Sequence, residues 1–321
     1  MNLGPFVLEP AVKDYIWGGT RLKTEYGKKT DLDVVAESWE CSIHPDGYSR
    51  IATGPWKGRT LAEFLEAHPE AMGIHGQRYK NLPVLVKLID AKEDLSVQVH
   101  PNSAYALEHE GQSGKTELWY ILKADPGATL IYGFAHDVTP ELVRRSAQNG
   151  TILEHLQRVP VCEGDVFFIE PGTVHAIGGG ILLAEIQENS NVTYRIYDYS
   201  RRDKEGKLRE LHLEKALEVM DFKAAKVPRS PQRMIRYTPG MARELVGRCQ
   251  SFQVERIAIN GECSLRSSAD SLQIYVVIEG ESRIGRADCA HTIKAGETIL
   301  IAANRGEGKI YGRASLIRVD I

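Results

Sequence analysis

The middle of the chain alternates short apolar runs with turn-forming residues. Between residues 84 and 200 the runs are rich in β-branched and aromatic residues, and Gly, Pro, Asp and Asn separate one run from the next. This pattern predicts the short strands of a sandwich or barrel rather than alternating strands and helices. The predicted strands are VLVKLIDA (84–91), LSVQVH (95–100), TELWYILKA (116–124), ATLIYGF (128–134), GDVFFIEP (164–171), GILLAEIQ (180–187) and VTYRIYDYS (192–200). We therefore predict a mostly β protein.

Helix-capping signals interrupt this strand pattern. A capping box has Ser or Thr at the N-cap with Glu or Gln three residues later, and glycine commonly ends a helix. The signals are the pairs Thr60/Glu63 and Thr151/Glu154, the N-cap Thr139 before Pro140, and the closing residues Gly111 and Gly150. They predict a helix near 103–110 and a helical excursion at about 136–160, and HLEKALEVM (212–220) predicts another helix.

Beyond residue 240 the strand pattern resumes and echoes the middle of the chain. The echo aligns GDVFFIEPGTVH (164–175) with GETILIAANRGE (296–307), and ELWYILKA (117–124) with QIYVVIEG (273–280). In this alignment Glu307 stands opposite His175, and Gln273 stands opposite Glu117. The sequence therefore predicts a β-repeat in which one copy carries chemistry and the other is structural.

A stretch with three prolines, KAAKVPRSPQRMIRYTPG (223–240), separates the two copies and is interpreted as a linker. We therefore expect a first domain over residues 1–230, which contains the helical excursion, and a second domain over residues 235–321. Only the first domain is expected to hold a metal, because the second copy lacks the His and Glu of the first.

Composition limits the classes of function. The 42% of hydrophobic and 26% of charged residues are ordinary for a globular protein, and a net charge of -3 with interspersed signs gives no basic patch for nucleic acid or membrane. No apolar run reaches the roughly 18 residues of a membrane span, and the N-terminus lacks a signal-peptide pattern. The five cysteines are scattered without a C-x-x-C pair, which argues against disulfides and thiolate zinc clusters: Cys41, Cys162, Cys249, Cys263 and Cys289. We expect a cytoplasmic monomer or weak homodimer that binds a small molecule.

Four side chains have the chemistry of a metal site. Gln98 and His100 share one face of a strand, Glu117 begins a following strand, and His175 comes after a PGT turn. Taken singly, His100 is more often a satisfied surface histidine and Glu117 an exposed edge residue. Together they favour a metal held by rigid elements with a position open for substrate. This set suits Zn²⁺ best, while ligand chemistry alone also allows Co²⁺, Mn²⁺ or Fe²⁺.

The motifs around these residues resemble those of a known family. SVQVHP (96–101), GKTELWYIL (114–122) and PGTVHAIGGG (171–180) resemble the metal motifs of the cupins, and specifically those of the short form of type I phosphomannose isomerases. Further similar stretches are WGG (17–19), AESWE (36–40) and NVTYRIYDYSR (191–201), and the tail is similar to the second, degenerate cupin domain of that family. One departure is Glu170-Pro171-Gly172, where cupins usually have Pro-x-Gly. We expect the turn to survive.

The resemblance implies a fold and a cofactor. It implies two cupin-like jelly-roll β-barrels with a small helical insertion, the first catalytic and the second without a metal site. It also implies one Zn²⁺ per chain, with Gln98, His100, Glu117 and His175 as its ligands.

The resemblance also implies an activity and its residues. The family interconverts mannose 6-phosphate and fructose 6-phosphate through a cis-enediolate. This reaction requires a base, an electrophile and residues that bind the phosphate. Family positions assign Arg195 to enediolate or phosphate stabilisation and match Glu185 to an acidic residue that acts as the base. They also place Lys115 in the site, where it could transfer a proton or bind the phosphate. Without the family, Arg195 would be interpreted as a rim ion pair with Asp198 or Glu188. Lys115 would be an exposed hairpin lysine, and Glu185 a structural carboxylate.

Ser96 and Lys87 are the expected phosphate-binding residues, by position and by family likeness. Lys87 stands in a run of valines and leucines, where an unpaired ammonium is rarely buried. Three other functions stay open: a cupin dioxygenase with Fe²⁺, a non-enzymatic sugar-binding cupin, and an isomerase of unphosphorylated mannose. Gln98 in place of a histidine counts against the first, and the presence of Lys115 and Arg195 counts against the second.

Overall fold

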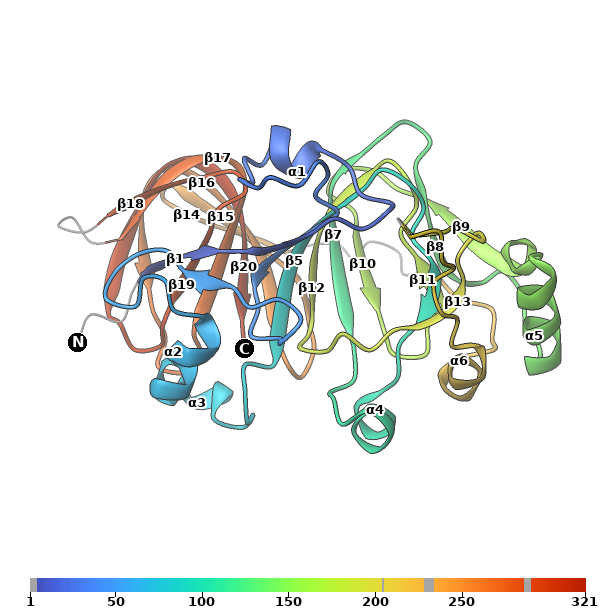
Figure 1. Cartoon of the computed structure of the whole chain (residues 1–321). Helices are drawn as coiled ribbons and strands as arrows, with labels where there is room; N and C mark the ends of the chain where they lie inside the picture. The colour runs from blue at the N-terminus through green and yellow to red at the C-terminus, as the bar shows by residue number, and fades with distance from the viewer. Residues whose placement is uncertain (1–4, 204, 228–233, 286–289) are drawn as a thin grey trace.

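Three β-sheets, arranged as successive layers, make up the molecule (Figure 1). The computed structural model describes residues 5–203, 205–227, 234–285 and 290–321. The prediction of a mostly β, cupin-like jelly-roll fold is confirmed, although the sheets pack as sandwiches and do not close into barrels. Within the described residues, no helix combines the length and apolar character needed to span a membrane.

The middle layer is a six-stranded antiparallel sheet whose two faces are both covered. Its strands, in spatial order, are β10 (Val166–Ile169), β7 (Glu117–Ala124), β12 (Ile181–Glu188), β5 (Val84–Ala91), β3 (Glu37–Cys41) and β2 (Ala11–Lys13). Alternate residues of a strand point to opposite faces. Leu88, Leu118 and Ile186 therefore face a nine-stranded sheet, described below, that contains the C-terminal strands. Ile89 and Trp119 face the five-stranded sheet on the opposite side. Burial of both faces explains why these strands are apolar almost throughout.

The second layer, a five-stranded sheet, covers the face that carries the odd-numbered residues of β5, β7 and β12. Its strands, in spatial order, are β13 (Tyr194–Tyr197), β6 (Val97–Val99), β11 (His175–Ala176), β8 (Thr129–Phe134) and β9 (Leu156–Pro160). Three helices flank this sheet at the right of Figure 1: α4 (Ser103–Glu110), α5 (Pro140–Asn149) and α6 (Leu213–Val219). The sandwich of these two sheets holds the predicted site.

The third layer is a nine-stranded sheet that joins the two ends of the chain. Its strands are β14 (Ile235–Thr238), β15 (Met241–Arg248), β16 (Gln253–Arg266), β20 (Glu307–Asp320), β17 (Gln273–Gly285), β19 (Thr298–Ile301), β1 (Phe6–Glu9) and β4 (Arg50–Ile51) in spatial order, with β18 (His291–Lys294) paired to β17. The N-terminal strand β1 hydrogen-bonds to β19. The expected first domain ends at residue 230, which lies outside the described residues. The division of the chain into domains over residues 1–230 and 235–321 therefore stays a prediction.

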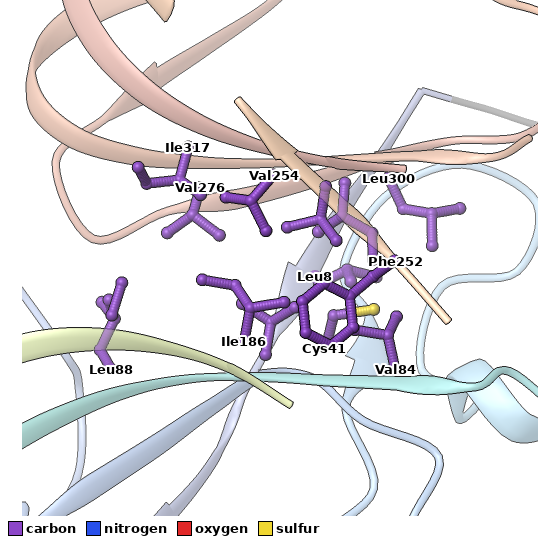
Figure 2. Packing of buried hydrophobic residues seen from close by; sticks show 14 of the residues in the cluster. Leu8, Cys41, Val84, Leu88, Ile186, Phe252, Val254, Val276, Leu300 and Ile317 are labelled. Carbon is purple, nitrogen blue, oxygen red and sulfur yellow. The ribbon is translucent and has the colours of Figure 1, made fainter. Parts of the chain in front are cut away.

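A large apolar core joins the nine-stranded sheet to the middle sheet. Figure 2 shows Val84, Leu88 and Ile186 of the middle sheet facing Val254, Val276 and Ile317 of the nine-stranded sheet. All of these side chains are buried. At about 25 cal/mol per Å² of buried apolar surface, a contact of this extent strongly favours association of the two layers. Packing against the nine-stranded sheet therefore holds the middle sheet in place, and the opposite face of the middle sheet contributes residues to the predicted site.

Most predicted helices are confirmed, and one cap is wrong. Thr60 and Glu63 form both bonds of a capping box at α2 (Leu61–Ala67), and Thr139 caps α5. Gly111 and Gly150 end α4 and α5 in the left-handed conformation. Thr151 forms no side-chain cap, and a 3-10 turn η2 (Ile152–His155) follows it. The remaining helical turns are α1 (Arg21–Thr24), η1 (Pro69–Met72) and α3 (Gly73–Gly76).

Strand register confirms the internal repeat. In the first copy, Ile169 of β10 pairs with Glu117 of β7. In the second copy, Ile301 of β19 pairs with Gln273 of β17, as the alignment of the two segments predicts. The predicted linker is partly wrong, because its residues Ile235–Thr238 form β14, while 228–233 lie outside the described residues.

The described cysteines form no disulfide, which agrees with the scattered pattern in the sequence. Cys289 lies outside the residues that the structure describes. The free thiols are Cys41, Cys162, Cys249 and Cys263.

Candidate active site

Two histidines and one glutamate from distant parts of the chain meet between the facing sheets. The ligand atoms of His100, Glu117 and His175 lie within 4.8 Å of one another, and all three residues are buried. His100 Nε2 lies 3.1 Å from His175 Nε2 and 3.2 Å from Glu117 Oε1. The other carboxylate oxygen of Glu117 lies 3.7 Å from His175 Nε2. The structure therefore brings three of the four predicted metal ligands together.

Each of the two sheets supplies part of this group. In the five-stranded sheet His175 of β11 pairs with Gln98 of β6, and His100 directly follows β6. Glu117 begins β7 of the middle sheet and pairs with Gln187 of β12. Because odd positions of β7 face the five-stranded sheet, the Glu117 carboxylate crosses the sandwich toward the two imidazoles. The site therefore depends on the packing of the two sheets.

The two imidazoles present lone pairs to each other. His100 Nδ1 lies 2.9 Å from the carbonyl oxygen of Val192, and His175 Nδ1 lies 2.8 Å from that of Thr173. A carbonyl oxygen only accepts, so each Nδ1 carries the proton and each Nε2 is left unprotonated. Two lone pairs on nitrogens 3.1 Å apart repel unless a cation lies between them. This arrangement fits a metal ion.

The protonation states of the triad also suit a metal. Burial and the positive charge of Lys115 lower the pKa of His100 to about 3, and burial lowers the pKa of His175. Burial would raise the pKa of Glu117, but the positive charge of Lys115 and the adjacent His100 outweigh it and hold that pKa well below its usual range. Lys115 Nζ lies 2.8 Å from Glu117 Oε1, yet neither carboxylate oxygen receives a hydrogen bond from a described residue. Neutral imidazoles and an ionised carboxylate are the forms that ligate zinc.

Gln98, the fourth predicted ligand, lies next to the triad. Its side-chain nitrogen lies 3.3 Å from His175 Nε2. An amide ligates through its oxygen, and rotating the amide by half a turn exchanges the oxygen and nitrogen. The residues present therefore fit Zn²⁺, with Gln98 as the ligand whose amide has to turn.

A cleft of about 330 Å³ adjoins the triad and collects the other predicted residues. Lys115 and Gln98 connect the two, because Lys115 Nζ lies 3.4 Å from His100 Nε2 and the Gln98 amide contacts His175. The predicted residues that line the cleft are Gln98, Arg195, Lys115, Glu185, Ser96 and Lys87. The cleft and the triad form one candidate active site.

Lys87 and Glu185 form an ion pair in the wall of the cleft. They are cross-strand neighbours on β5 and β12, and Lys87 Nζ lies 3.0 Å from Glu185 Oε2. Lys87 Nζ also lies 3.6 Å from Glu37 Oε2, and Trp119 Nε1 donates a hydrogen bond to Glu185 Oε1 at 3.0 Å. Burial and the negative charge of Glu117 raise the pKa of Glu185, in the direction that the sequence predicts for a partly buried carboxylate. The ammonium of Lys87 is buried but paired.

Arg195 reaches the cleft from β13. Its Nε donates to Ser96 Oγ at 3.3 Å, and a terminal nitrogen donates to the Glu210 carbonyl oxygen at 2.7 Å. Among the described residues Arg195 forms no ion pair, so the rim pair with Asp198 or Glu188 that the sequence left open is not made. The guanidinium charge of Arg195 is therefore available to the cleft.

Comparison with known proteins shows the family. Residues 6–119 match the family described as phosphomannose isomerase type I, catalytic domain, and residues 242–321 match mannose-6-phosphate isomerase, cupin domain. The chain is 40% identical to the mannose-6-phosphate isomerase ManA of Bacillus subtilis, over 99% of both chains. It belongs to the type I phosphomannose isomerases. The mannose-6-phosphate isomerase of Streptococcus mutans is 35% identical over 92% of each chain. The crystal structure of the mannose 6-phosphate isomerase from Bacillus subtilis matches with a TM-score of 0.91 at 35% identity, covering 99% of both chains.

In this phosphomannose isomerase the turn before His175 survives the departure from Pro-x-Gly, as expected. Gly172 adopts a φ of 89°, which a side chain would disfavour. Its backbone nitrogen donates to the carbonyl oxygen of His100 at 2.9 Å, and the Thr173 nitrogen donates to that of Glu170 at 3.1 Å. The turn thus ties together the two segments that carry the imidazoles.

Two charged residues in the cleft of this phosphomannose isomerase were not predicted. Glu37 lines the cleft and accepts a hydrogen bond from Trp39 Nε1 at 2.7 Å. A glutamate within the buried run AESWE was a usable signal, because a buried carboxylate needs a partner. Arg209 also lines the cleft. It follows the last predicted strand of the first domain, and the sequence carries no local signal that would bring it to the site.

Proposed function

We propose that this enzyme interconverts mannose 6-phosphate and fructose 6-phosphate and requires one Zn²⁺ for the reaction. The buried group of His100, Glu117 and His175 beside a polar cleft carries this proposal. The substrate is inferred from the relatives named above, since ManA of Bacillus subtilis carries the name mannose-6-phosphate isomerase. We further infer a cytoplasmic enzyme, monomeric or weakly dimeric, that acts on a small sugar phosphate.

The proposed metal ligands are His100, His175, Glu117 and Gln98. Carbonyl groups fix both imidazoles through Nδ1, which directs the Nε2 lone pairs to one point. A bound Zn²⁺ would supply Lewis-acid stabilisation of sugar oxygens, worth several kcal/mol in such sites. The chain's own residues then have to move the proton and hold the substrate.

Glu185 and Lys115 are the proposed proton-transfer groups. The reaction moves a proton between C1 and C2 through a cis-enediolate, so one group has to remove it and return it. Glu185 lines the cleft, and its raised pKa makes it a stronger base than an ordinary carboxylate. Lys115 also lines the cleft, where its ammonium can donate to a sugar oxygen. Arg195, which has no ion-pair partner among the described residues, is proposed to stabilise the negative charge of the enediolate.

Ser96 and Lys87 are the proposed phosphate contacts. Both line the cleft, and Ser96 is hydrogen-bonded to Arg195. Lys87 is balanced by Glu185 and Glu37, so it offers a hydrogen bond to the phosphate rather than net charge.

A coupled isomerase assay with mannose 6-phosphate tests the proposal directly. The protein is assayed as purified, after chelation, and after Zn²⁺ is added back. We expect chelation to abolish activity and Zn²⁺ to restore it. Full turnover by metal-free protein would contradict the role of the metal, and no turnover with any divalent ion would contradict the activity.

The remaining alternative is an isomerase of unphosphorylated mannose. Comparing kcat/KM for mannose and for mannose 6-phosphate separates the two. We expect a large preference for the phosphorylated sugar, because the phosphate dianion adds charge-assisted hydrogen bonds that mannose lacks. Equal values would favour the unphosphorylated substrate.

A further inference from the structure

A turn of the nine-stranded sheet reaches the middle sheet near the start of β7. This turn, residues 249–252, joins β15 to β16, and the Cys249 nitrogen donates to the Phe252 carbonyl oxygen at 2.9 Å. Phe252 is 2% exposed and lies in the apolar core between the two sheets (Figure 2). The hydroxyl of Tyr79, which follows α3, donates to the Gln250 carbonyl oxygen at 2.8 Å. The turn is therefore anchored at several points.

Ser251, within this turn, holds a glutamate of the middle sheet. Ser251 is 5% exposed, and its Oγ donates to Glu188 Oε1 at 2.7 Å. The other carboxylate oxygen, Glu188 Oε2, accepts a hydrogen bond from the Thr116 backbone nitrogen at 3.0 Å. Hydrogen bonds to an ionised carboxylate are stronger than those between neutral groups. Because Glu188 forms no ion pair with a described residue, these two bonds fix the position of its carboxylate.

The Glu188 carboxylate replaces a backbone carbonyl at the end of the ladder between β7 and β12. Glu117 pairs with Gln187, so one position further along the chain Thr116 stands opposite Glu188. The Glu188 nitrogen donates to the Thr116 carbonyl oxygen at 3.0 Å, as in a regular antiparallel pair. The return bond is different, because the Glu188 carbonyl oxygen accepts from the Gln187 side chain instead. The Thr116 nitrogen therefore depends on the Glu188 side chain for its partner.

Thr116 separates two residues of the proposed active site, Lys115 and Glu117. Lys115 Nζ lies 2.8 Å from Glu117 Oε1, which lies 3.2 Å from His100 Nε2. A shift of Thr116 moves both neighbours, because planar peptide units join the three residues. Metal ligands and catalytic groups have to be held within about 0.5 Å of their working positions. The support given to Thr116 therefore bears on the site.

We propose that Ser251, acting through the Glu188 carboxylate, positions the start of β7 and with it Glu117 and Lys115. This inference rests on the proposed function, and it gives the nine-stranded sheet a part in the site beyond packing. Ser251 and Glu188 are positioning residues, since neither lines the cleft. The contact comes from a turn outside the apolar interior of the second copy, so that interior takes no part in it.

The test compares Ser251→Ala with the matched control Ser271→Ala. Ser271 is another buried serine, 3% exposed, whose hydroxyl bonds only to the backbone of Leu272 and Ile321. The zinc dissociation constant of each protein is measured by competition with a chelating dye, which requires no turnover. We expect Ser251→Ala to raise this constant roughly 3- to 10-fold, below the 10- to 100-fold typical of direct partners of metal ligands. Ser271→Ala should keep the parent value.

Further variants separate positioning from a general loss of stability. Denaturant unfolding should show similar losses in Ser251→Ala and Ser271→Ala, because each removes the bonds of one buried hydroxyl. Ser251→Thr keeps the hydroxyl and should bind zinc nearly as tightly as the parent. Adding Ser251→Ala to Glu188→Ala should weaken zinc binding no further, because the two residues act as one unit. Parent affinity in Ser251→Ala, an equal loss in Ser271→Ala, or no recovery in Ser251→Thr would overturn the proposal.

Kinetics separates a failure of this inference from a failure of the proposed activity. At saturating zinc, Ser251→Ala should lower kcat for mannose 6-phosphate roughly 3- to 10-fold through misplacement of Lys115 and Glu117, with KM close to the parent value. Weaker zinc binding by Ser251→Ala, in a protein inactive on mannose 6-phosphate, would uphold the inference and reject the function. Active enzyme with unchanged zinc affinity and kcat in Ser251→Ala would do the reverse. A parent protein that binds no zinc would reject both.

Discussion

The two copies of the β-repeat share a strand register and differ in what they bury. The first copy directs His100, Glu117 and His175 into its interior, beside a polar cleft. The second copy fills its interior with apolar side chains such as Tyr275, Ile299 and Leu316. Within the described residues no second group of metal-ligating side chains occurs.

The equivalent positions explain this difference. Gln273, which stands opposite Glu117 in the repeat, is buried, accepts a hydrogen bond from Tyr275 and donates one to the Arg266 carbonyl oxygen. Glu307, opposite His175, lies on the surface with 72% of its side chain exposed. At these two positions, therefore, the second copy directs no free ligand atom into its interior. In the first copy two buried imidazole Nε2 atoms lie 3.1 Å apart beside the ionised carboxylate of Glu117, an arrangement that a bound cation would stabilise.

The largest effect is expected from removing a ligand in the first copy. We predict that His175→Ala loses its bound zinc and lowers kcat/KM on the order of 10³-fold or more, since Lewis-acid stabilisation is worth several kcal/mol. The matched change His291→Ala, in β18 of the second copy, should keep both zinc and activity. Metal analysis together with the isomerase assay checks this contrast. Loss of zinc in His291→Ala would contradict the expected difference between the two copies.

Neutralising one carboxylate in each copy gives the next largest effect. We predict that Glu185→Gln lowers kcat roughly 10²- to 10⁴-fold, because a positioned base contributes about that much, while zinc content stays the same. Glu307→Gln on the surface of the second copy should leave kcat unchanged. Steady-state kinetics and metal analysis test both variants. Unchanged kcat in Glu185→Gln would remove Glu185 from proton transfer.

The pH dependence should report the same carboxylate. Glu185 accepts a proton only when ionised, and its burial raises its pKa. Activity should therefore fall as the pH decreases, and it should begin to fall above the ordinary glutamate pKa of about 4.3. The measurement is the kcat/KM profile of the zinc-loaded enzyme, with zinc content followed over the same pH range. An acid limb that coincides with zinc release would instead report the metal ligands.

The smallest effect on catalysis is expected from the core of the second copy. Leu316 is buried in that core, so Leu316→Ala should lower the free energy of unfolding by about 2–5 kcal/mol. Zinc content and kcat/KM of the folded protein should remain close to the parent values. The matched change Leu183→Ala, in the core behind the cleft, should lower both stability and kcat/KM. Denaturant unfolding and the assay together test this, and equal catalytic losses in both variants would contradict a purely structural second copy.

Local features of the fold were predictable from the sequence. The strands β5, β7 and β12 and the caps Thr60 and Thr139 follow from apolar runs and neighbouring residues, which act over a few positions. The Thr151 cap was wrong because the same residue types also begin a 3-10 turn. The strands of the first 51 residues were not predicted, and β1 pairs with β19 almost 300 positions away. No local pattern records such a pairing.

The sequence by itself determined the ligand types, their order along the chain and the faces of the strands on which they stand. It could do so because alternation within a strand is a local property of the backbone. Only the tertiary structure decided that β7 and β11 face each other, that Lys87 is paired with Glu185, and that Arg209 enters the cleft. These outcomes depend on how whole sheets pack and on where a loop returns, which are set by contacts between residues far apart in the chain.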